Sequence, residues 1–425
     1  MAADLFSEFE WRGMVYESTE GAREVLAREK VTAYIGFDPS ASSLHVGSLL
    51  PIMALARLQR FGHSPIAIAG GGTGLIGDPS GKTQERQLLT VEQVEQNLAG
   101  IRAQLARFLD FEVASNPARI VNNADWLVPM DLMRFLRDVG KYFTVNYMLA
   151  KESVRRRLEQ EDGISYTEFS YLMLQSYDYL TLFDRYTCTL QMGGSDQWGN
   201  ITAGADLIRR LRGAKAHGLV MPLVTTASGV KFGKTEAGAV WLDARLTSPF
   251  RFFQFWLNTD DRDVVKYLKF FTFLGREEID ALEAGVAIAP ERREAQRVLA
   301  REVTRTIHGQ DAVDRAEHAS GLLFGERISE LDVDDIIAVF DDVPSIGMPA
   351  AQFADPGTTI ADMLVAAKLA SSKSDAMRLV RGGGVYVNNR RVTDERARFT
   401  ADQAIANRVF VLRKGSRQYH LVRIE

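Results

Sequence analysis

The chain has 425 residues, 46% hydrophobic and 25% charged, a composition typical of soluble globular proteins with about two or three domains. A single cysteine, Cys188, excludes a disulfide framework and indicates a reducing compartment, so we expect the cytoplasm. The N-terminus has no apolar run typical of a secretory signal, and no segment is long enough to predict a membrane span.

The net charge of −4 is unevenly distributed along the chain. Residues 371–425 carry 12 Lys or Arg against 5 Asp or Glu, a net charge of +7, which leaves −11 for the remainder. A basic tail on an acidic body is a common footprint of nucleic-acid binding. A solvated charged face is the alternative interpretation.

The pattern of apolar residues divides the chain into regions. Residues 31–230 alternate apolar runs with helical stretches, which predicts an α/β fold with a doubly wound, Rossmann-like parallel sheet. Residues 260–325 have a helical pattern, which predicts an α-helical domain. Prolines and glycines then indicate a linker, and two helical stretches and a strand from Thr359 onward predict a small α+β unit. The predicted regions are 1–247, 248–330, 331–356 (linker) and 357–425.

The first apolar run, residues 31–37, is followed by a short polar turn and a second, longer apolar segment. This pattern predicts a strand, a turn and a helix with Ser42 or Ser43 as N-cap. His45 and Gly47 would then lie in the first helical turn, where free backbone N–H groups and the helix dipole suit phosphate. An ordinary strand–helix turn with a surface histidine is the alternative.

The Gly-rich segment 70–83 partly matches two nucleotide-binding patterns. Gly72 to Gly77 fits the dinucleotide pattern, but the region about 20 residues further on has a helical pattern instead of a strand ending in an acid. Residues 81–83 fit the end of a P-loop, but Ile76 stands where its first glycine must be. We reject both interpretations.

Three polar side chains, Tyr171, Gln175 and Asp178, are spaced i, i+4, i+7, so on a helix they share one face. A pocket for an amino acid with a polar aromatic tip explains a phenol, an amide and a carboxylate among apolar neighbours. In such a pocket Asp178 and Tyr34 can hydrogen-bond a substrate phenol. A solvated helix face is the alternative.

Two later segments suit a nucleotide. The glycines before Asp196 permit close backbone approach, and its carboxylate can accept hydrogen bonds from ribose hydroxyls, although an Asx-capped turn is the plain alternative. Lys231 and Lys234 lie on a loop flanked by glycines and can stabilise negative charge that develops on a triphosphate.

Five segments, in this order, resemble the motifs of class I aminoacyl-tRNA synthetases and look like the bacterial tyrosine-specific branch. They are Tyr34 to Ser48, Gly77 to Lys82, Tyr171 to Asp178, Gly193 to Asn200 and Lys231 to Thr235. Ser48 departs from the family motif, which has a second histidine there, so its contact with phosphate or ribose would be shorter. The terminal unit resembles the RNA-binding domain named after ribosomal protein S four, and the resemblance covers nearly the whole chain.

The resemblance implies a ligase that activates L-tyrosine with ATP and transfers it to the 3′ end of tRNA(Tyr). The residues it implies in catalysis are His45, Lys82, Arg86, Lys231, Lys234 and Thr235. Those implied in tyrosine binding are Tyr34, Asp78, Tyr171, Gln175, Asp178 and Gln197. Those implied in ATP binding are Asp38, His45, Gly47, Ser48, Gly194, Asp196, Leu223, Val224 and Lys234. Those implied in RNA binding are Lys373, Arg378, Arg381, Arg390 and Arg391.

The family also implies partners. We expect Mg²⁺ to accompany ATP as substrate, with no tightly bound cofactor and no metal held by the protein. We expect a homodimer that binds tRNA and no membrane. Lys151, Arg155, Arg156 and Arg157 either touch the tRNA acceptor stem or form a solvated helix face.

Two rival functions stay open at this point. The tryptophan-specific relative is disfavoured by Asp178 and Tyr34, because an indole has no hydroxyl group. A synthetase-like RNA-binding or regulatory protein without activity is disfavoured by the intact Lys231, Lys234 and Asp196.

Overall fold

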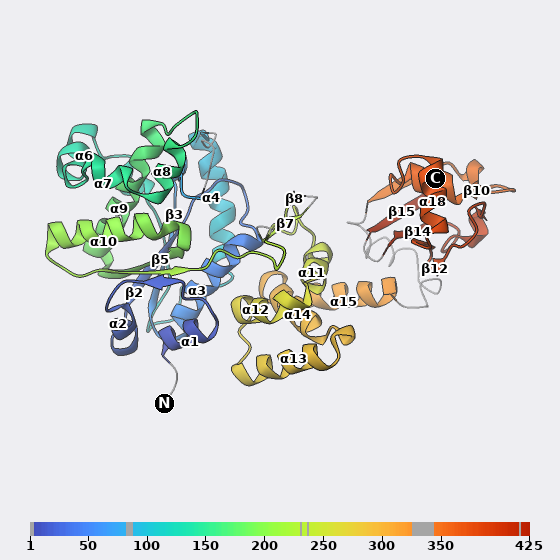
Figure 1. Ribbon diagram of the computed structural model, residues 1–425, viewed down its shortest axis with the longest axis horizontal. Helices are drawn as coiled ribbons and strands as arrows, with labels where there is room; N and C mark the ends of the chain where they lie inside the picture. Colours follow the sequence, from blue (N-terminus) through green and yellow to red (C-terminus); the bar gives the residue numbers. More distant parts are fainter. Residues whose placement is uncertain (1–3, 82–87, 230–231, 236–237, 325–343, 416–417) are drawn as a thin grey trace. The chain divides into compact units, whose positions relative to one another are not determined.

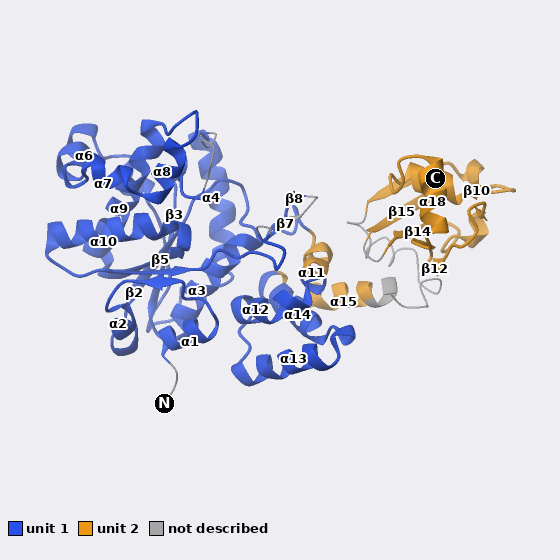
Figure 2. Ribbon diagram, in the orientation of Figure 1, with its two compact units in different colours: residues 1–247, 256–307 blue, residues 248–255, 308–425 orange. Residues whose placement is uncertain are grey.

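The structure is a computed structural model that describes residues 4–81, 88–229, 232–235, 238–324, 344–415 and 418–425. Its contacts divide the chain into two compact units (Figure 2). These are residues 1–247 with 256–307, and residues 248–255 with 308–425. None of the helices in the described ranges is long and apolar enough to cross a membrane.

In the described part of the first unit, a six-stranded sheet has the order β1-β6-β5-β2-β3-β4 (Figure 1). β1 is antiparallel to β6, and the other neighbours are parallel. β2, β3, β5 and β6 are mostly buried, which explains their continuous apolar sequences. The strands are β1 (Glu17–Ser18), β2 (Thr32–Phe37), β3 (Ser64–Ala69), β4 (Arg119–Asn122), β5 (Cys188–Gly194) and β6 (His217–Met221).

The strand order reverses between β2 and β5, because β3 and β4 lie to one side of β2 and β5 and β6 to the other. Ligands of such sheets bind beyond the carboxyl ends of the strands at this reversal. Helix α3 (Leu49–Arg60) packs on β2 and β3, and α10 (Trp198–Arg212) packs on β5 and β6 from the opposite face (Figure 1). The predicted doubly wound fold is therefore confirmed.

The turn after β2 differs in detail from the prediction. A short 3-10 turn over Val46–Ser48 comes first, with His45 as its N-cap, and α3 begins only at Leu49. Ser42 and Ser43 are therefore not the N-cap, and the Ser43 hydroxyl donates to the carbonyl oxygen of Leu44 at 2.7 Å. The 3-10 turn and the helix share one apolar run, so the sequence pattern alone does not separate them.

The remaining helices surround this sheet or continue the chain beyond it. Those before residue 248 are α1 (Leu5–Trp11), α2 (Ala22–Arg28), α4 (Val91–Leu105), α5 (Ala124–Leu127), α6 (Leu132–Asp138), α7 (Val145–Leu149), α8 (Glu152–Leu158) and α9 (Tyr166–Tyr186). The short strands β7 (Lys234–Thr235) and β8 (Gly238–Ala239) form an antiparallel pair. The predicted helical region is confirmed as α11 (Pro249–Leu257), α12 (Asp261–Phe271), α13 (Arg276–Ile288), α14 (Glu294–His308) and α15 (Gln310–Phe324).

The C-terminal part of the second unit is the predicted α+β structure. Its five-stranded sheet has the order β12-β11-β14-β15-β9, with a buried core that includes Ile360, Leu364 and Phe410. The elements are β9 (Ser345–Met348), β10 (Thr358–Thr359), α17 (Ile360–Ala366), α18 (Lys373–Arg381), β11 (Val385–Val387), β12 (Arg390–Arg391), β13 (Arg398–Phe399), β14 (Val409–Lys414) and β15 (Gln418–Ile424).

One predicted boundary is wrong. Residues 345–348 were assigned to the linker 331–356, but they form β9, which pairs in parallel with β15. Phe353 is also buried in the core of this C-terminal α+β structure. Prolines flank this four-residue strand, and prolines at such spacing are typical of loops, so the sequence pattern does not predict a strand here.

Candidate active site

A cavity of about 580 Å³ lies at the carboxyl ends of β2 and β5. It brings together every residue predicted to bind tyrosine and, apart from Lys234, every residue predicted to bind ATP. These lining residues are Tyr34, Asp38, His45, Gly47, Ser48, Asp78, Tyr171, Gln175, Asp178, Gly194, Asp196, Gln197, Leu223 and Val224. One pocket therefore contains segments that are distant in the sequence.

Some predicted catalytic residues cannot be placed in this way. Lys82, Arg86 and Lys231 lie outside the described residues. For Lys234 and Thr235 the structure describes the backbone, which forms β7, and not the side chains.

The deep end of the cavity contains two buried acidic groups, a phenol and a carboxyl. Tyr34 in β2 is 1% exposed, and its ring packs edge-on against Tyr179 at 5.3 Å between centroids. Its hydroxyl is buried and has no hydrogen-bond partner among the described residues. Burial and the nearby Asp178 raise the pKa of Tyr34 well above its usual value, so the phenol stays neutral.

Asp178 on α9 is held by two donors that sequence reasoning missed. Asn123 Nδ2 donates to Asp178 Oδ2 at 2.9 Å, and Trp126 Nε1 donates to Oδ1 at 2.7 Å. Burial raises the pKa of Asp178 to about 7, against the opposing effect of these two hydrogen bonds. Asn123 comes directly after β4, at the same edge of the sheet as the pocket. This position after a predicted strand was the one feature of the sequence that could have indicated Asn123 as a pocket residue.

A chain of hydrogen bonds joins the polar residues beside this end. Asp78 accepts from Gln197 Nε2 at 2.6 Å and from the Ser80 N–H at 2.9 Å. Gln175 donates to Gln197 at 3.2 Å and accepts from Asn200 Nδ2 at 2.8 Å. The predicted side chains therefore form one network, in which Ser80 and Asn200 are additional members.

The Tyr171 hydroxyl donates to Asp38 Oδ2 at 2.9 Å, so a residue predicted for tyrosine binding contacts one predicted for ATP binding. Thr73 donates to the other oxygen of Asp38 at 2.8 Å and accepts from Asn123 at 2.9 Å. These bonds link the two halves of the cavity.

The part of the cavity that is predicted to bind ATP is shaped by glycines. A Cβ at Gly47 would lie 2.7 Å from His45 Cε1, so this tight turn excludes a side chain. The His45 Nδ1 accepts from the Gly47 N–H at 3.0 Å. A Cβ at Gly194 would lie 2.6 Å from Asp196 Oδ1, so a side chain there would push against the Asp196 carboxylate.

The residues predicted to bind RNA are all exposed in the second unit: Lys373, Arg378, Arg381, Arg390 and Arg391. Three of them make ion pairs with acidic neighbours at the surface. The pairs are Lys373–Asp362 at 2.6 Å, Arg378–Asp375 at 2.7 Å and Arg381–Glu395 at 2.8 Å.

The basic stretch at residues 151–157 is not one solvated or RNA-contacting face. Arg157 is buried in an ion pair with Glu168 at 2.6 Å and donates to the Gly163 carbonyl at 3.1 Å. The helical period of α8 turns Arg157 inward, whereas Arg155 and Arg156 are exposed. The expectation for Arg157 was therefore wrong.

The chain is similar to known proteins over its whole length. The family model "tRNA synthetases class I (W and Y)" matches residues 26–325, and a model for the C-terminal domain of tyrosine–tRNA ligases of the SYY-like type matches residues 335–422. The tyrosine–tRNA ligase of Roseiflexus castenholzii is 58% identical over 420 residues, and that of Bacillus caldotenax is 52% identical over 423 residues. Each alignment covers 99% of both chains.

A solved structure agrees with these relatives. The crystal structure of a C-terminally truncated mitochondrial tyrosyl-tRNA synthetase from Aspergillus nidulans matches with a TM-score of 0.68 and 32% identity. The match covers 76% of this chain and 94% of that chain.

Proposed function

The chain belongs to the class I aminoacyl-tRNA synthetases, in the tyrosine-specific branch, and we propose that its pocket recognises the phenol of tyrosine through Tyr34 and Asp178. As a tyrosine–tRNA ligase, it joins L-tyrosine to tRNA with ATP as the second substrate. The tyrosine carboxylate attacks the α-phosphate of ATP and pyrophosphate leaves. A hydroxyl at the 3′ end of the tRNA then attacks the tyrosyl carbonyl of the adenylate, and AMP leaves. This assignment excludes the tryptophan-specific and the inactive rival.

The observation that carries the proposal is the buried Tyr34 hydroxyl, which has no partner among the described residues and shares the cavity with Asp178. A substrate phenol between them donates its O–H to the Asp178 carboxylate and accepts from Tyr34. Phenylalanine leaves the buried Tyr34 hydroxyl unpaired and offers the Asp178 carboxylate no donor beyond Asn123 and Trp126, which costs binding free energy. Tyrosyl-tRNA synthetases are themselves the standard example of such rejection, by a factor of ~10⁵.

At the other end of the substrate, Asp78 would hold the α-ammonium group, with Tyr171 and Gln175 beside it. The support is the hydrogen-bond network that links Asp78, Gln197 and Gln175 within the same cavity. A carboxylate with fixed partners offers an ammonium group charge and orientation together. Gln197 would contact the substrate between this group and the nucleotide.

In the nucleotide half, His45 and the backbone at Gly47 would meet the phosphates and the adenine ring. Asp38 would contribute to ATP binding, Asp196 would accept from the ribose hydroxyls beside Gly194, and Ser48 would make a short polar contact. Leu223 and Val224 would border the adenine. The support is that all these residues line one cavity at the reversal of the sheet.

No protein nucleophile is needed, because both reacting groups belong to the substrates. Catalysis would consist of positioning and electrostatic stabilisation of the charge that develops on the triphosphate. We assign this stabilisation to His45 and, by their places in the motifs, to Lys82, Arg86, Lys231, Lys234 and Thr235.

We propose that ATP arrives with Mg²⁺, bound mainly through its own phosphate oxygens. Removal of divalent ions with EDTA should therefore abolish adenylate formation.

We propose a division of labour along the chain. Residues 1–247 would carry the small-molecule chemistry, residues 248–330 would form the helical domain on the anticodon side, and the basic tail would bind the tRNA. The support for the last is the net charge of +7 in residues 371–425 and the exposure of Arg390 and Arg391.

We also propose that the chain works as a homodimer in the cytoplasm. The support for a dimer is the group of exposed apolar residues on and around α6, a helix with no buried residue. They are Val128, Leu132, Met133, Leu136 and Val145. The single, buried Cys188 fits a reducing compartment.

The catalytic part of the proposal is tested by Lys234→Ala. Single-turnover adenylate formation should fall ~10²–10³-fold, the scale of one lost transition-state donor. Tyrosine affinity should stay within about twofold, because Lys234 would contact only the triphosphate. The exposed Lys215→Ala is the matched control and should leave both quantities unchanged. A normal single-turnover rate combined with weak tyrosine binding would show that the assigned role is wrong.

A further inference from the structure

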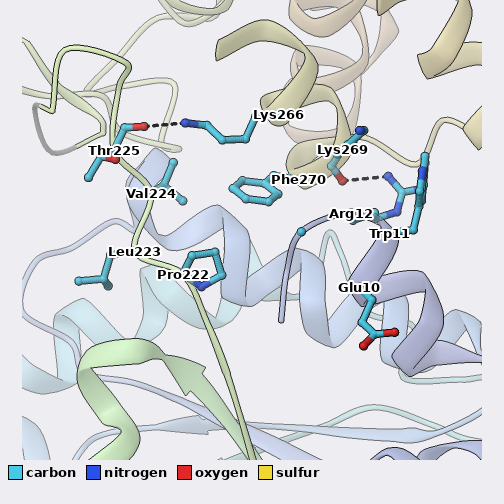
Figure 3. A pocket seen from close by; sticks show the side chains of 11 residues that line it. Glu10, Trp11, Arg12, Pro222, Leu223, Val224, Thr225, Lys266, Lys269 and Phe270 are labelled. Atoms are coloured by element: carbon cyan, nitrogen blue, oxygen red, sulfur yellow. Dashed lines mark hydrogen bonds between the residues drawn. The ribbon is translucent and has the colours of Figure 1, made fainter. Parts of the chain in front are cut away.

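The backbone that follows β6 is held by side chains of α12. Asp263, which is buried, accepts from the Ala227 N–H at 2.8 Å. Lys266 Nζ donates to the Thr225 carbonyl at 3.0 Å (Figure 3), and also to Asp263 at 3.0 Å. The Tyr267 hydroxyl donates to the same Thr225 carbonyl at 3.3 Å. Three neighbouring side chains of one helix therefore fix two peptide groups of this segment.

These hydrogen bonds matter because the segment is not packed solidly against α12. A cavity of about 500 Å³ lies beside it, with Leu223 on one wall, Phe270 on α12 and Trp11 on α1 (Figure 3). This cavity and the cavity of the proposed ATP site share Leu223 as a lining residue, so the segment that carries Leu223 borders both. Polar bonds, and not a continuous apolar core, thus set the distance between the segment and α12 here.

The next contact along the chain is aromatic. Phe232 is 4% exposed, and its ring stacks on Phe271 of α12, with 5.4 Å between centroids and 12° between planes. The rings of Tyr267 and Trp256 lie 4.8 and 5.5 Å away. The Phe232 N–H donates to the Val224 carbonyl at 3.2 Å. Phe232 is therefore fixed from both its side chain and its backbone.

On its other side this part of the chain meets the turn at Val46–Ser48, which lies before α3. A Cβ at Gly233 would lie 2.5 Å from Val46 Cγ2 and 3.4 Å from the Gly47 nitrogen. The Val46 N–H donates to the Val240 carbonyl at 2.9 Å, and the Val240 N–H donates to Gly233 at 3.1 Å. The turn at Val46–Ser48 and the backbone at Gly233 are therefore in direct contact, and the ring of Phe232 packs on α12.

Helix α12 is itself fixed to the catalytic core by two buried arginines. Arg57, near the end of α3, donates to the Phe270 carbonyl at 2.9 Å, and Arg12 donates to the Leu274 carbonyl at 2.8 Å. Cations at a helix C-terminus satisfy its free carbonyls and complement its dipole. Since α3 begins directly after the turn at Gly47, Arg57 joins the helix that follows this turn to α12.

We propose that α12 is the positioning element for the backbone of Phe232–Thr235, which carries Lys234. Tyr267 acts on it through the Phe232 ring, and Asp263 and Lys266 act through the backbone at Ala227 and Thr225. This inference rests on the proposed role of Lys234 at the triphosphate. The residues touch no substrate themselves. They set where the backbone that carries the lysine lies, and a displacement of about 1 Å can cost ~10²-fold in rate.

The test compares Asp263→Ala with the exposed Asp280→Ala on α13 as matched control. We expect adenylate formation to fall ~10–100-fold in Asp263→Ala and to stay at the wild-type rate in Asp280→Ala. Tyrosine affinity should remain within twofold in both, since the phenol and ammonium contacts lie elsewhere. Tyr267→Phe keeps the ring contacts and removes one hydrogen bond, so it should cost roughly threefold to tenfold without loss of folding.

A double-mutant cycle separates positioning from general damage. If Asp263 acts through Lys234, Asp263→Ala should lower the rate by less than about threefold in a Lys234→Ala background. If the effects of Asp263→Ala and Lys234→Ala on the rate of adenylate formation are fully additive, the inference is overturned. It is also overturned if Asp263→Ala and Tyr267→Phe both keep a rate within twofold of wild type while Lys234→Ala is impaired. If Lys234→Ala keeps the wild-type rate, the proposed role of Lys234 fails first, and the inference fails with it.

Discussion

At the scale of single residues, the chemistry of the pocket centres on the pair Tyr34 and Asp178. The apolar run before Asp38 predicts the strand that carries Tyr34. The spacing of polar residues predicts the helix face that carries Asp178. Asn123 and Trp126, which hold Asp178, could not be predicted, because hydrogen bonds between elements depend on how those elements meet in space. Periodicity indicates which face a side chain is on, but it does not identify its neighbours across the pocket.

The raised pKa of Asp178 predicts that tyrosine binding depends on pH. In the proposed binding mode the ionised carboxylate would accept the phenol O–H, and with a pKa of about 7 only about a tenth of it is ionised at pH 6. The dissociation constant for tyrosine should therefore increase roughly tenfold from pH 8 to pH 6. Equilibrium dialysis with labelled tyrosine measures this directly. Asp178→Asn, which has no charge to lose, should bind weakly with no such pH dependence.

The same shift has a definite sign for stability. The folded protein holds the Asp178 proton more tightly than the unfolded chain, whose carboxyl has its ordinary pKa. The stabilising contribution of this group is therefore fully present below pH 4 and is lost as pH rises toward about 7.

The binding experiment also has an outcome that would contradict the account. A wild-type dissociation constant for tyrosine that is flat between pH 6 and pH 8 would contradict the assignment of the Asp178 carboxylate as phenol acceptor.

At the scale of elements, prediction succeeded where one periodicity extends over a whole segment. β2 and α9 follow their patterns closely. The boundaries of short elements were harder to predict. The 3-10 turn at Val46–Ser48 shares the apolar pattern of α3, and the strand β9 is flanked by prolines that are typical of a loop. The exposed apolar residues of α6 were visible in the sequence, but their exposure depends on the fold.

The exposed face of α6 predicts the behaviour of a dimer. Leu132→Glu places a charge on a residue that is 68% exposed and would be desolvated at a subunit interface. Sedimentation equilibrium should show wild type at twice the chain mass of 47.4 kDa and the variant shifted toward the single chain. Val91→Glu on α4, at a residue 53% exposed, is the control and should stay dimeric. Equal masses for wild type and Leu132→Glu would remove α6 from the interface.

At the scale of the whole molecule, the strand order and the uneven charge account for two kinds of substrate. The fold class could be predicted because buried parallel strands leave continuous apolar runs in the sequence. The start of the tail was misplaced, since β9 joins its sheet only through pairing with β15, which is distant in the sequence. Every residue assigned to tyrosine or ATP precedes Gly238, and the basic residues of the tail follow Ser371.

This separation predicts the effect of removing the tail. A chain that ends before Pro344, so that β9 is removed with its sheet, should keep tyrosine-dependent pyrophosphate exchange and lose most tRNA charging. Binding of tRNA by the full chain should weaken steeply with salt, because each phosphate contact releases counterions. Both activities and tRNA binding at two salt concentrations should be measured for both chains. Full charging by the shortened chain with an unchanged salt dependence would assign tRNA recognition to the other domains.

The central claim is that the pocket reads a phenol between Tyr34 and Asp178. Amino-acid-dependent ATP–pyrophosphate exchange, measured with each of the common amino acids on the full-length protein, tests it most directly. The account predicts exchange with tyrosine and none above background with phenylalanine or tryptophan, because only tyrosine brings a hydroxyl that can pair with both Tyr34 and Asp178. Exchange with phenylalanine at a rate equal to that with tyrosine would contradict it.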